Sequence, residues 1–208
     1  MIIKTFVEGP IDANNYLIID ENTNEAVLID CSSSCTKFID AVKSTGVNLK
    51  YILLTHGHFD HLLGIDKFKE VFNADVYVSE DDLNQVKLVP DMMQMFLGMV
   101  PETVSQITHY IKDGDEFSIG DLKIKAVSTP GHTKGGMCYL VEDKLFSGDT
   151  LFFGSVGRCD LLDGDLNAIS KSIKEKLFTL PDNVEVFPGH GGKTTIGYEK
   201  KYNEIINI

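Results

Sequence analysis

The chain repeats one pattern of secondary structure twice, and this repetition constrains its fold more than any other feature. Each half begins with strand-like segments rich in β-branched and aromatic residues, continues with an amphipathic helix and returns to a strand. Strands are predicted at 2–7, 15–20, 25–30, 50–55, 75–79, 115–120, 122–129, 136–142, 144–149 and 184–189, and helices at 36–46, 66–72, 80–88, 166–180 and 195–206. No linker separates the halves, so residues 1–208 are expected to form a single α/β domain of two packed sheets flanked by helices.

The composition narrows the partners that such a domain could have. Its formal net charge of −12 over 208 residues disfavours general binding to nucleic acid or to an anionic membrane. An anionic substrate would therefore need a local positive centre, such as a metal ion or a well-placed arginine. The segment MIIKTFVEGP lacks the apolar core of a signal peptide, and no apolar run approaches the roughly 20 residues of a membrane span. The four cysteines form no CxxC pair, so we expect a cytoplasmic protein with free thiols.

A methionine-rich segment between two prolines, PDMMQMFLGMVP, interrupts the regular alternation. Met92, Met95 and Met99 are spaced as one face of a helix, which favours ordinary core packing. The alternative is an adaptable flap over a binding site, because methionine side chains are flexible and fit irregular surfaces. The sequence leaves both interpretations of segment 91–100 open.

The polar residues that could carry chemistry come directly after predicted strands. The strand at 50–55 leads into THGHFDH, and later strands lead into TPGHTKGG, DT and PGHGG. Glycine in or beside each of these loops lets the backbone turn sharply and approach a bound group. His109 lies outside such a context. The candidates are His56, His58, Asp60, His61, His132, Asp149 and His190.

These candidates have the chemistry of a metal centre. Imidazole and carboxylate together suit borderline divalent ions such as zinc, iron and manganese. Seven ligands are too many for one ion, but they suit two ions that share a carboxylate, as in two-metal hydrolases. Because the set contains no cysteine, a purely structural zinc site is not expected.

The same residues carry a family resemblance that runs the length of the chain. THGHFDH resembles the T-H-x-H-x-D-H signature of the metallo-β-lactamase superfamily, and His132, Asp149 and His190 complete its pattern. NNYLI near the start and Asp30 at the end of its strand extend the likeness. GHTKGG and FSGDTLFFGSVGRCDL are most similar to the glyoxalase II branch, the hydroxyacylglutathione hydrolases and their short relatives.

The resemblance implies a four-layer αββα sandwich with its site between the loop edges of the two sheets. It implies two divalent metal ions, zinc foremost and iron or manganese as alternatives. The lactamases proper typically have cysteine where Asp149 stands, so this aspartate argues against a β-lactamase. The implied ligands are His56, His58 and His132 for the first metal, Asp60, His61 and His190 for the second, and Asp149 as the bridge between them.

Two basic residues are candidates for substrate binding. Arg158 lies at the offset from Asp149 where glyoxalase II enzymes place a basic residue that grips a carboxylate of glutathione. A guanidinium fits a carboxylate through two parallel hydrogen bonds, but an ion pair with Asp160 or another nearby acid would explain Arg158 equally well. Lys134, in the glycine-flanked turn after His132, is the weaker candidate.

The resemblance therefore predicts metal-dependent hydrolysis of a small-molecule thioester of the S-(2-hydroxyacyl)glutathione type. A hydroxide between the metals would attack the carbonyl, with Asp60 or Asp149 holding or receiving the proton. The alternative is a persulfide dioxygenase, which shares this fold but uses one iron, here held by His56, His132 and Asp149. A non-catalytic metal-binding domain ranks last, because such a domain would be expected to have lost ligands and none is missing.

Overall fold

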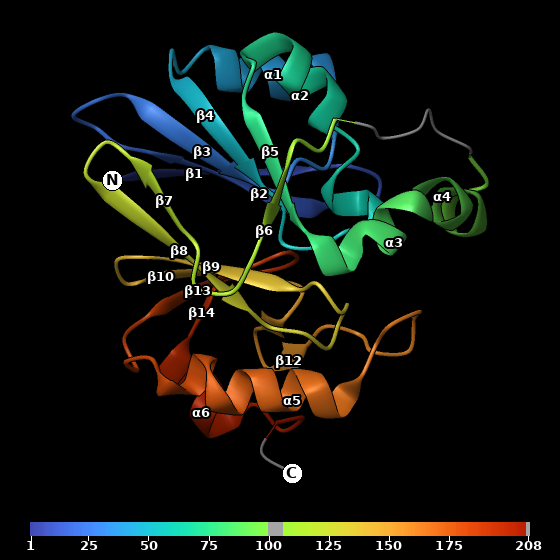
Figure 1. Ribbon diagram of the computed structural model, residues 1–208. Coiled ribbons are helices and arrows are strands. Elements are labelled where there is room, and N and C mark those ends of the chain that lie inside the picture. Colours follow the sequence, from blue (N-terminus) through green and yellow to red (C-terminus); the bar gives the residue numbers. More distant parts are fainter. Residues whose placement is uncertain (100–105, 207–208) are drawn as a thin grey trace.

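The computed structural model describes residues 1–99 and 106–206. Two β-sheets lie face to face, and helices cover the outer side of each sheet (Figure 1). The four-layer αββα arrangement implied by the family resemblance is therefore confirmed.

The first sheet has six strands in the order of the sequence. They are β1 (Ile2–Glu8), β2 (Ala13–Ile19), β3 (Glu25–Ile29), β4 (Asn48–Leu53), β5 (Asp75–Ser79) and β6 (His109–Ile111). β1, β2 and β3 pair antiparallel, whereas β3 to β6 pair parallel. Parallel neighbours need crossover connections, which α1 (Thr36–Lys43) and α2 (Ile65–Phe72) supply on the outer face (Figure 1). The connection from β5 to β6 contains η2 (Glu80–Asp82), α3 (Leu83–Lys87) and α4 (Val89–Leu97).

The second sheet also has six strands, in the order β14-β13-β10-β9-β8-β7. They are β7 (Glu116–Ile119), β8 (Leu122–Ser128), β9 (Met137–Val141), β10 (Lys144–Gly148), β13 (Glu185–Pro188) and β14 (Thr194–Thr195). Only the β10–β13 pair is parallel. The small hairpin of β11 (Leu151–Phe152) and β12 (Ser155–Val156) follows β10. α5 (Leu166–Glu175), η3 (Leu177–Thr179) and α6 (Ile196–Tyr202) cover the outer face (Figure 1).

Three hydrophobic clusters fill the spaces between the four layers. One joins the first sheet to α1 and α2 and includes Phe38 and Phe68, and another joins the second sheet to α5 and includes Ile169. The middle cluster lies between the sheets, where the rings of Tyr16 and Phe187 pack edge to face with centroids 5.5 Å apart. Strand β2 is buried along its whole length because it contributes side chains to clusters on both of its faces.

The predicted strands and helices are present, with changes at their ends. The helix predicted over 166–180 ends at Glu175, where Lys176 forms the C-cap (φ −115°, ψ −55°) and a separate 3₁₀ turn follows. The helix predicted over 80–88 likewise begins as a 3₁₀ turn before α3. The last helix stops at Tyr202 rather than near 206. The short strands β6, β11, β12 and β14 were not predicted.

The prediction that Met92, Met95 and Met99 pack into the core is wrong for two of these three residues. Met95 is 76% exposed and Met99 is 61% exposed, while Met92 is half-buried. The methionine of α4 that packs into the core is Met93, which the predicted face does not include. Val100, at the end of the segment, lies outside the described residues.

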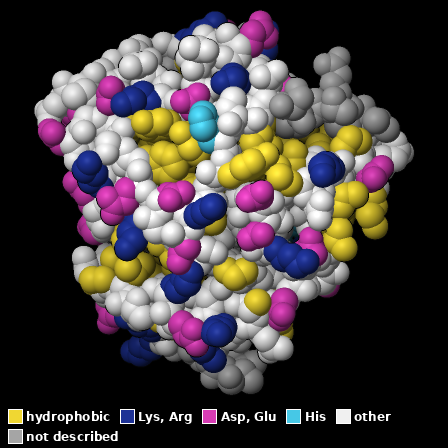
Figure 2. Space-filling model, viewed as in Figure 1, with side chains coloured by type: hydrophobic (Ala, Val, Ile, Leu, Met, Phe, Trp, Pro, Cys, Tyr) yellow, Lys and Arg dark blue, Asp and Glu magenta, His cyan; other side chains and the backbone are white. Residues whose placement is uncertain are grey.

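The surface carries charges of both signs and some exposed apolar groups. Figure 2 shows Lys and Arg side chains interspersed with Asp and Glu, and apolar side chains gathered near α4. Exposed Met95 and Phe96 belong to that helix. Within residues 1–99 and 106–206, no helix combines the length and apolar character needed to cross a membrane.

Candidate metal centre

The seven predicted ligand residues lie together where strands of both sheets end. They are His56 and His58 after β4, Asp60 and His61 in the 3₁₀ turn η1 (Phe59–His61), His132 after β8, Asp149 after β10 and His190 after β13. Four come from the first half of the chain and three from the second, so the site exists only when the two sheets are packed together.

Six of the seven residues form two groups, and Asp149 is described separately below. The first ligand group is His56, His58 and His132, and the second is Asp60, His61 and His190. Within each group, one nitrogen or oxygen atom of every residue lies within 4.8 Å of the others. His56, His61 and Asp149 form a further set of this kind, so the two groups adjoin, and the assignment of each residue to one metal stays a prediction.

Asp149 lies between the two groups. Its Oδ1 is 3.5 Å from Nε2 of His61, in the second group, and its Oδ2 is 3.6 Å from Nε2 of His132, in the first. Oδ2 also lies 3.8 Å from Nε2 of His190, in the second group, so the carboxylate faces both groups, as a ligand shared by two ions would. Gly189 permits this approach, because a Cβ there would lie 2.2 Å from Oδ1 of Asp149.

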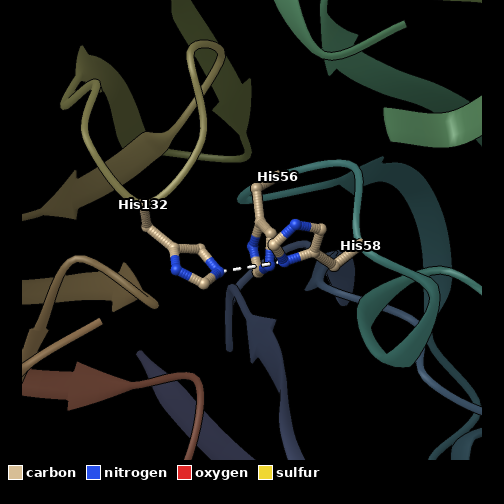
Figure 3. A group of neighbouring side chains, drawn as sticks. All are labelled: His56, His58 and His132. Carbon is tan, nitrogen blue, oxygen red and sulfur yellow. Dashed lines mark hydrogen bonds between the residues drawn. The ribbon is translucent and has the colours of Figure 1, made fainter. Parts of the chain in front are cut away.

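The rings of the first group point toward one another, as Figure 3 shows. Nε2 of His132 lies 3.0 Å from Nδ1 of His58, the contact drawn as a dashed line. The other nitrogen of His132, Nδ1, donates to the carbonyl oxygen of Arg158 at 2.7 Å. Since a neutral imidazole carries only one proton, Nε2 of His132 is left with a free lone pair for a metal.

Asp30 fixes the orientation of histidines in both groups. Its buried carboxylate accepts a hydrogen bond from Nδ1 of His61 at 2.8 Å and another from the hydroxyl of Thr55 at 2.8 Å. Because that hydroxyl has donated its only hydrogen, its oxygen accepts from Nδ1 of His56, 3.1 Å away. In their neutral forms, both histidines therefore present an unprotonated Nε2 to the centre.

Buried atoms without partners indicate that a cation fits here. Among the described residues, Nε2 of His56, Nε2 of His58 and Oδ1 of Asp149 are buried and have no hydrogen-bond partner. Burying a polar atom without a partner costs free energy, and a coordinated ion removes that cost. The donor set of imidazole and carboxylate fits divalent zinc, iron or manganese.

The two groups differ in charge. Burial and the neighbouring histidines lower the pKa of His56 well below its usual value, and burial and His132 lower the pKa of His58 to about 3. These rings are neutral at pH 7, the form that a metal requires. In the second group burial opposes charge, but carboxylates, Asp60 foremost, raise the pKa values of His61 and His190. A bound cation would take the place of the protons that these carboxylates favour on His61 and His190.

Asp82 holds the two loops of the first group together, a role that the sequence analysis did not predict. Its buried carboxylate accepts from the backbone N–H of Gly57 at 2.8 Å, between His56 and His58. It also accepts from the N–H of Gly135 at 2.7 Å and the hydroxyl of Thr133 at 2.8 Å, in the loop of His132. In the stretch SEDDLNQ nothing distinguishes Asp82 from its acidic neighbours.

The NNYLI stretch positions the loop of His190. The side-chain amide of Asn14 donates to the carbonyls of Pro188 at 2.9 Å and Gly191 at 3.0 Å, on either side of His190. The hydroxyl of Tyr16 donates to the same Pro188 carbonyl at 2.6 Å. Hydrogen bonds between β2 and the end of β13 therefore fix the position of the loop that carries His190.

A cavity of about 510 Å³ opens onto the two ligand groups. Among its described lining residues, the metal-ligand candidates are His58, Asp60, His132, Asp149 and His190. The rest are Ile11, Phe59, Met92, Phe96, Leu97, Phe152, Ser155, Val156, Arg158 and Leu161. Apart from Ser155 and Arg158, these are apolar, so the cavity combines polar chemistry at the metal centre with apolar walls.

The two basic candidates differ in their positions. Arg158 lines the cavity, but its guanidinium donates from Nε and Nη2 to the two oxygens of Asp160, at 2.7 and 2.8 Å. Its side chain is 51% exposed. Lys134 is absent from the described lining and forms an ion pair with Asp163 at 3.1 Å. Only Arg158 is placed to meet a molecule in the cavity.

Comparison with known sequences supports the family. The family model of the Metallo-beta-lactamase superfamily matches residues 9–190. The chain is 33% identical to probable metallo-hydrolase YqgX of Bacillus subtilis, over 96% of this chain and 94% of the relative. It is 32% identical to hydroxyacylglutathione hydrolase GloC of Haemophilus influenzae, over 93% of this chain and 92% of the relative.

Solved structures agree with this assignment. The structure of the BLEG-1 B3 metallo-beta-lactamase covers 100% of both chains with a TM-score of 0.92 and 31% identity. TTHA1623 in a di-iron-bound form gives a TM-score of 0.85 with 31% identity, over 97% of this chain and 98% of that one. ETHE1 from Myxococcus xanthus gives a TM-score of 0.82 with 29% identity, over 100% of this chain and 85% of that one. The chain belongs to the metallo-beta-lactamase superfamily.

Proposed function

We propose that this protein is a metal-dependent hydrolase that cleaves a thioester of the S-(2-hydroxyacyl)glutathione type. The observation that carries the proposal is the position of Asp149, whose carboxylate faces both ligand groups. The proposed cofactors are two divalent cations, zinc foremost and iron or manganese as alternatives. The likeness to GloC supports the substrate class.

Hydrolysis adds the oxygen of water to the thioester carbonyl carbon and breaks the C–S bond, and the acid and the thiol carry away the protons of the water. Bound divalent cations supply a water of lowered pKa and polarise the carbonyl. The proposed proton acceptors are Asp60 and Asp149, which are both largely buried beside the ligand histidines. Asp60 is ionised, because burial would raise its pKa but His61 and His190 hold it well below its usual value.

Arg158 is the proposed anchor for a substrate carboxylate at the cavity. Its guanidinium already holds a carboxylate, that of Asp160, in a two-pronged hydrogen-bond arrangement. Because this pair is exposed, exchanging Asp160 for a substrate carboxylate costs little free energy. Lys134 is not part of the proposed site, because its ammonium group pairs with Asp163 outside the described lining.

The alternative, a mononuclear iron persulfide dioxygenase, would use only His56, His132 and Asp149. The geometry favours the hydrolase, because Nδ1 of His58 lies 3.0 Å from Nε2 of His132 and so belongs to the same ligand group. Iron alone would not decide the matter, since the similar chain TTHA1623 is described in a di-iron-bound form. The reaction itself must be measured.

The test compares three substrates on the purified protein. We expect hydrolysis of S-lactoylglutathione, loss of that activity with a chelator and its return with zinc. Oxygen uptake on glutathione persulfide without thioester hydrolysis would replace the proposal with the dioxygenase. Hydrolysis of a β-lactam in place of the thioester would instead favour the activity named for BLEG-1.

A further inference from the structure

The cavity walls beyond the metal centre are more apolar than a lactoyl group requires. From the side of the first sheet, α4 contributes Met92, Phe96 and Leu97. From the side of the second sheet, the β11–β12 hairpin contributes Phe152 and Val156 (Figure 1). A lactoyl group carries one methyl and one hydroxyl, which would leave most of these walls uncovered.

The apolar walls begin at the reacting centre. Phe59 lies in the sequence between His58 and Asp60, and its ring stacks on that of Phe96, with centroids 6.1 Å apart and planes 24° apart. On the other side, the ring of Phe152 meets His190 edge to face at 6.4 Å. An acyl chain attached to a carbonyl at the ligand groups would therefore enter apolar surroundings at once.

The size and the charges of the cavity also favour an extended acyl chain. A volume of about 510 Å³ falls within the roughly 300–1,000 Å³ typical of small-molecule sites. Arg158 is the only lysine or arginine among the described lining residues and is half-exposed. The charged thiol carrier is thereby directed toward Arg158, and the apolar walls are left to the acyl group.

We propose that the substrate's acyl group bears an unbranched or aromatic apolar chain of several carbons, held between α4 and the β11–β12 hairpin. This inference rests on the proposed thioester hydrolysis and names its acyl specificity. α4 suits the role, because Met92 is a flexible side chain that can adjust to chains of different shape. The flap-like interpretation of the methionine-rich segment thus applies to Met92, whereas exposed Met95 lies outside the described lining.

The test is a series of 2-hydroxyacyl glutathione thioesters with one, two and four carbons beyond the hydroxyl-bearing carbon. We expect kcat/KM to rise about fourfold with each added methylene until the cavity is filled. Phe96→Ser should flatten this rise, and Phe96 is exposed enough for the change to leave the fold intact. Met95→Ser is the matched control on the same helix and should keep the wild-type dependence.

A binding measurement without turnover separates this inference from the proposed reaction. Calorimetric titration should show S-hexylglutathione binding at least about tenfold more tightly than S-methylglutathione, with the difference reduced in Phe96→Ser. If all the thioesters are hydrolysed and the lactoyl compound is preferred, the acyl inference is overturned and the hydrolase stands. If none of the thioesters is hydrolysed, the proposed function fails. Equal binding of S-hexylglutathione and S-methylglutathione would then overturn the acyl inference as well.

Discussion

Proton positions at single residues decide which atoms can hold a metal. Asp30 accepts from His61 directly and from His56 through Thr55, so it sets two rings at once. Its backbone adopts φ +60°, a left-handed conformation that few residues other than glycine, asparagine and aspartate adopt readily. The carboxylate and this backbone conformation together restrict the position to very few amino acids.

Asp30→Asn should lower metal affinity by about 10- to 100-fold with little change in fold, because asparagine tolerates the backbone but loses an acceptor oxygen. Competition with a metal indicator measures the change. Asp12→Asn is the matched control, since exposed Asp12 has nearly the same φ of +58°. Equal affinities of Asp30→Asn and wild type would show that Asp30 does not orient the histidines.

At the residue scale, the candidate metal ligands could be predicted from the sequence, but the residues that position them could not. Histidines beside glycine after strands are rare enough to stand out, and all seven ligand candidates meet in space. Asp82 could not be found, because its role depends on loops 25 and 53 residues away along the chain. The pairing of Lys134 with Asp163 likewise depends on how two distant loops pack.

At the scale of elements, the end of β5 supports loops that belong to different sheets. η2 follows β5 directly and places Asp82 between the loop of His56 and His58 and the loop of His132. Burial raises the pKa of Asp82 above its usual value, although its three hydrogen bonds favour the charged form. The first ligand group therefore depends on an element that supplies no ligand.

Asp82→Ala should destabilise the protein by at least about 2 kcal/mol, because it leaves buried donors of Gly57, Gly135 and Thr133 without an acceptor. It should also weaken metal binding at the first ligand group. Urea denaturation and metal titration measure the two effects. Exposed Asp81→Ala should change stability by less than about 0.5 kcal/mol, and wild-type behaviour of Asp82→Ala would exclude the clamp.

Strands and helices with long, regular patterns were predictable, and short ones were not. β2 and β4 end in continuous apolar runs, YLII and YIL, that local pattern alone identifies. β11, β12 and β14 have two residues each, too few for any periodicity, and they exist because the neighbouring chain pairs with them. The methionine face failed because spacing on a helix does not indicate which side meets the core, and here Met93 does.

At the scale of the whole molecule, the packing of the two sheets creates the site. Tyr16 of the first sheet and Phe187 of the second are in contact in the middle cluster, and the Tyr16 hydroxyl donates to the carbonyl of Pro188. His190 follows Pro188 by two residues. Its Nε2 lies 3.2 Å from Oδ2 of Asp60, which belongs to the other half of the chain. Core packing and ligand geometry are thus set by the same layers.

The most direct test of the two-metal account is the number of metal ions bound per chain, measured by elemental analysis of the purified protein after metal loading and gel filtration. We expect close to two ions for the wild type. Asp149→Ala should hold fewer, because it removes the carboxylate that faces both ligand groups. A wild-type protein that retains no more than one ion, or an Asp149→Ala variant that retains two with full activity, would contradict the account.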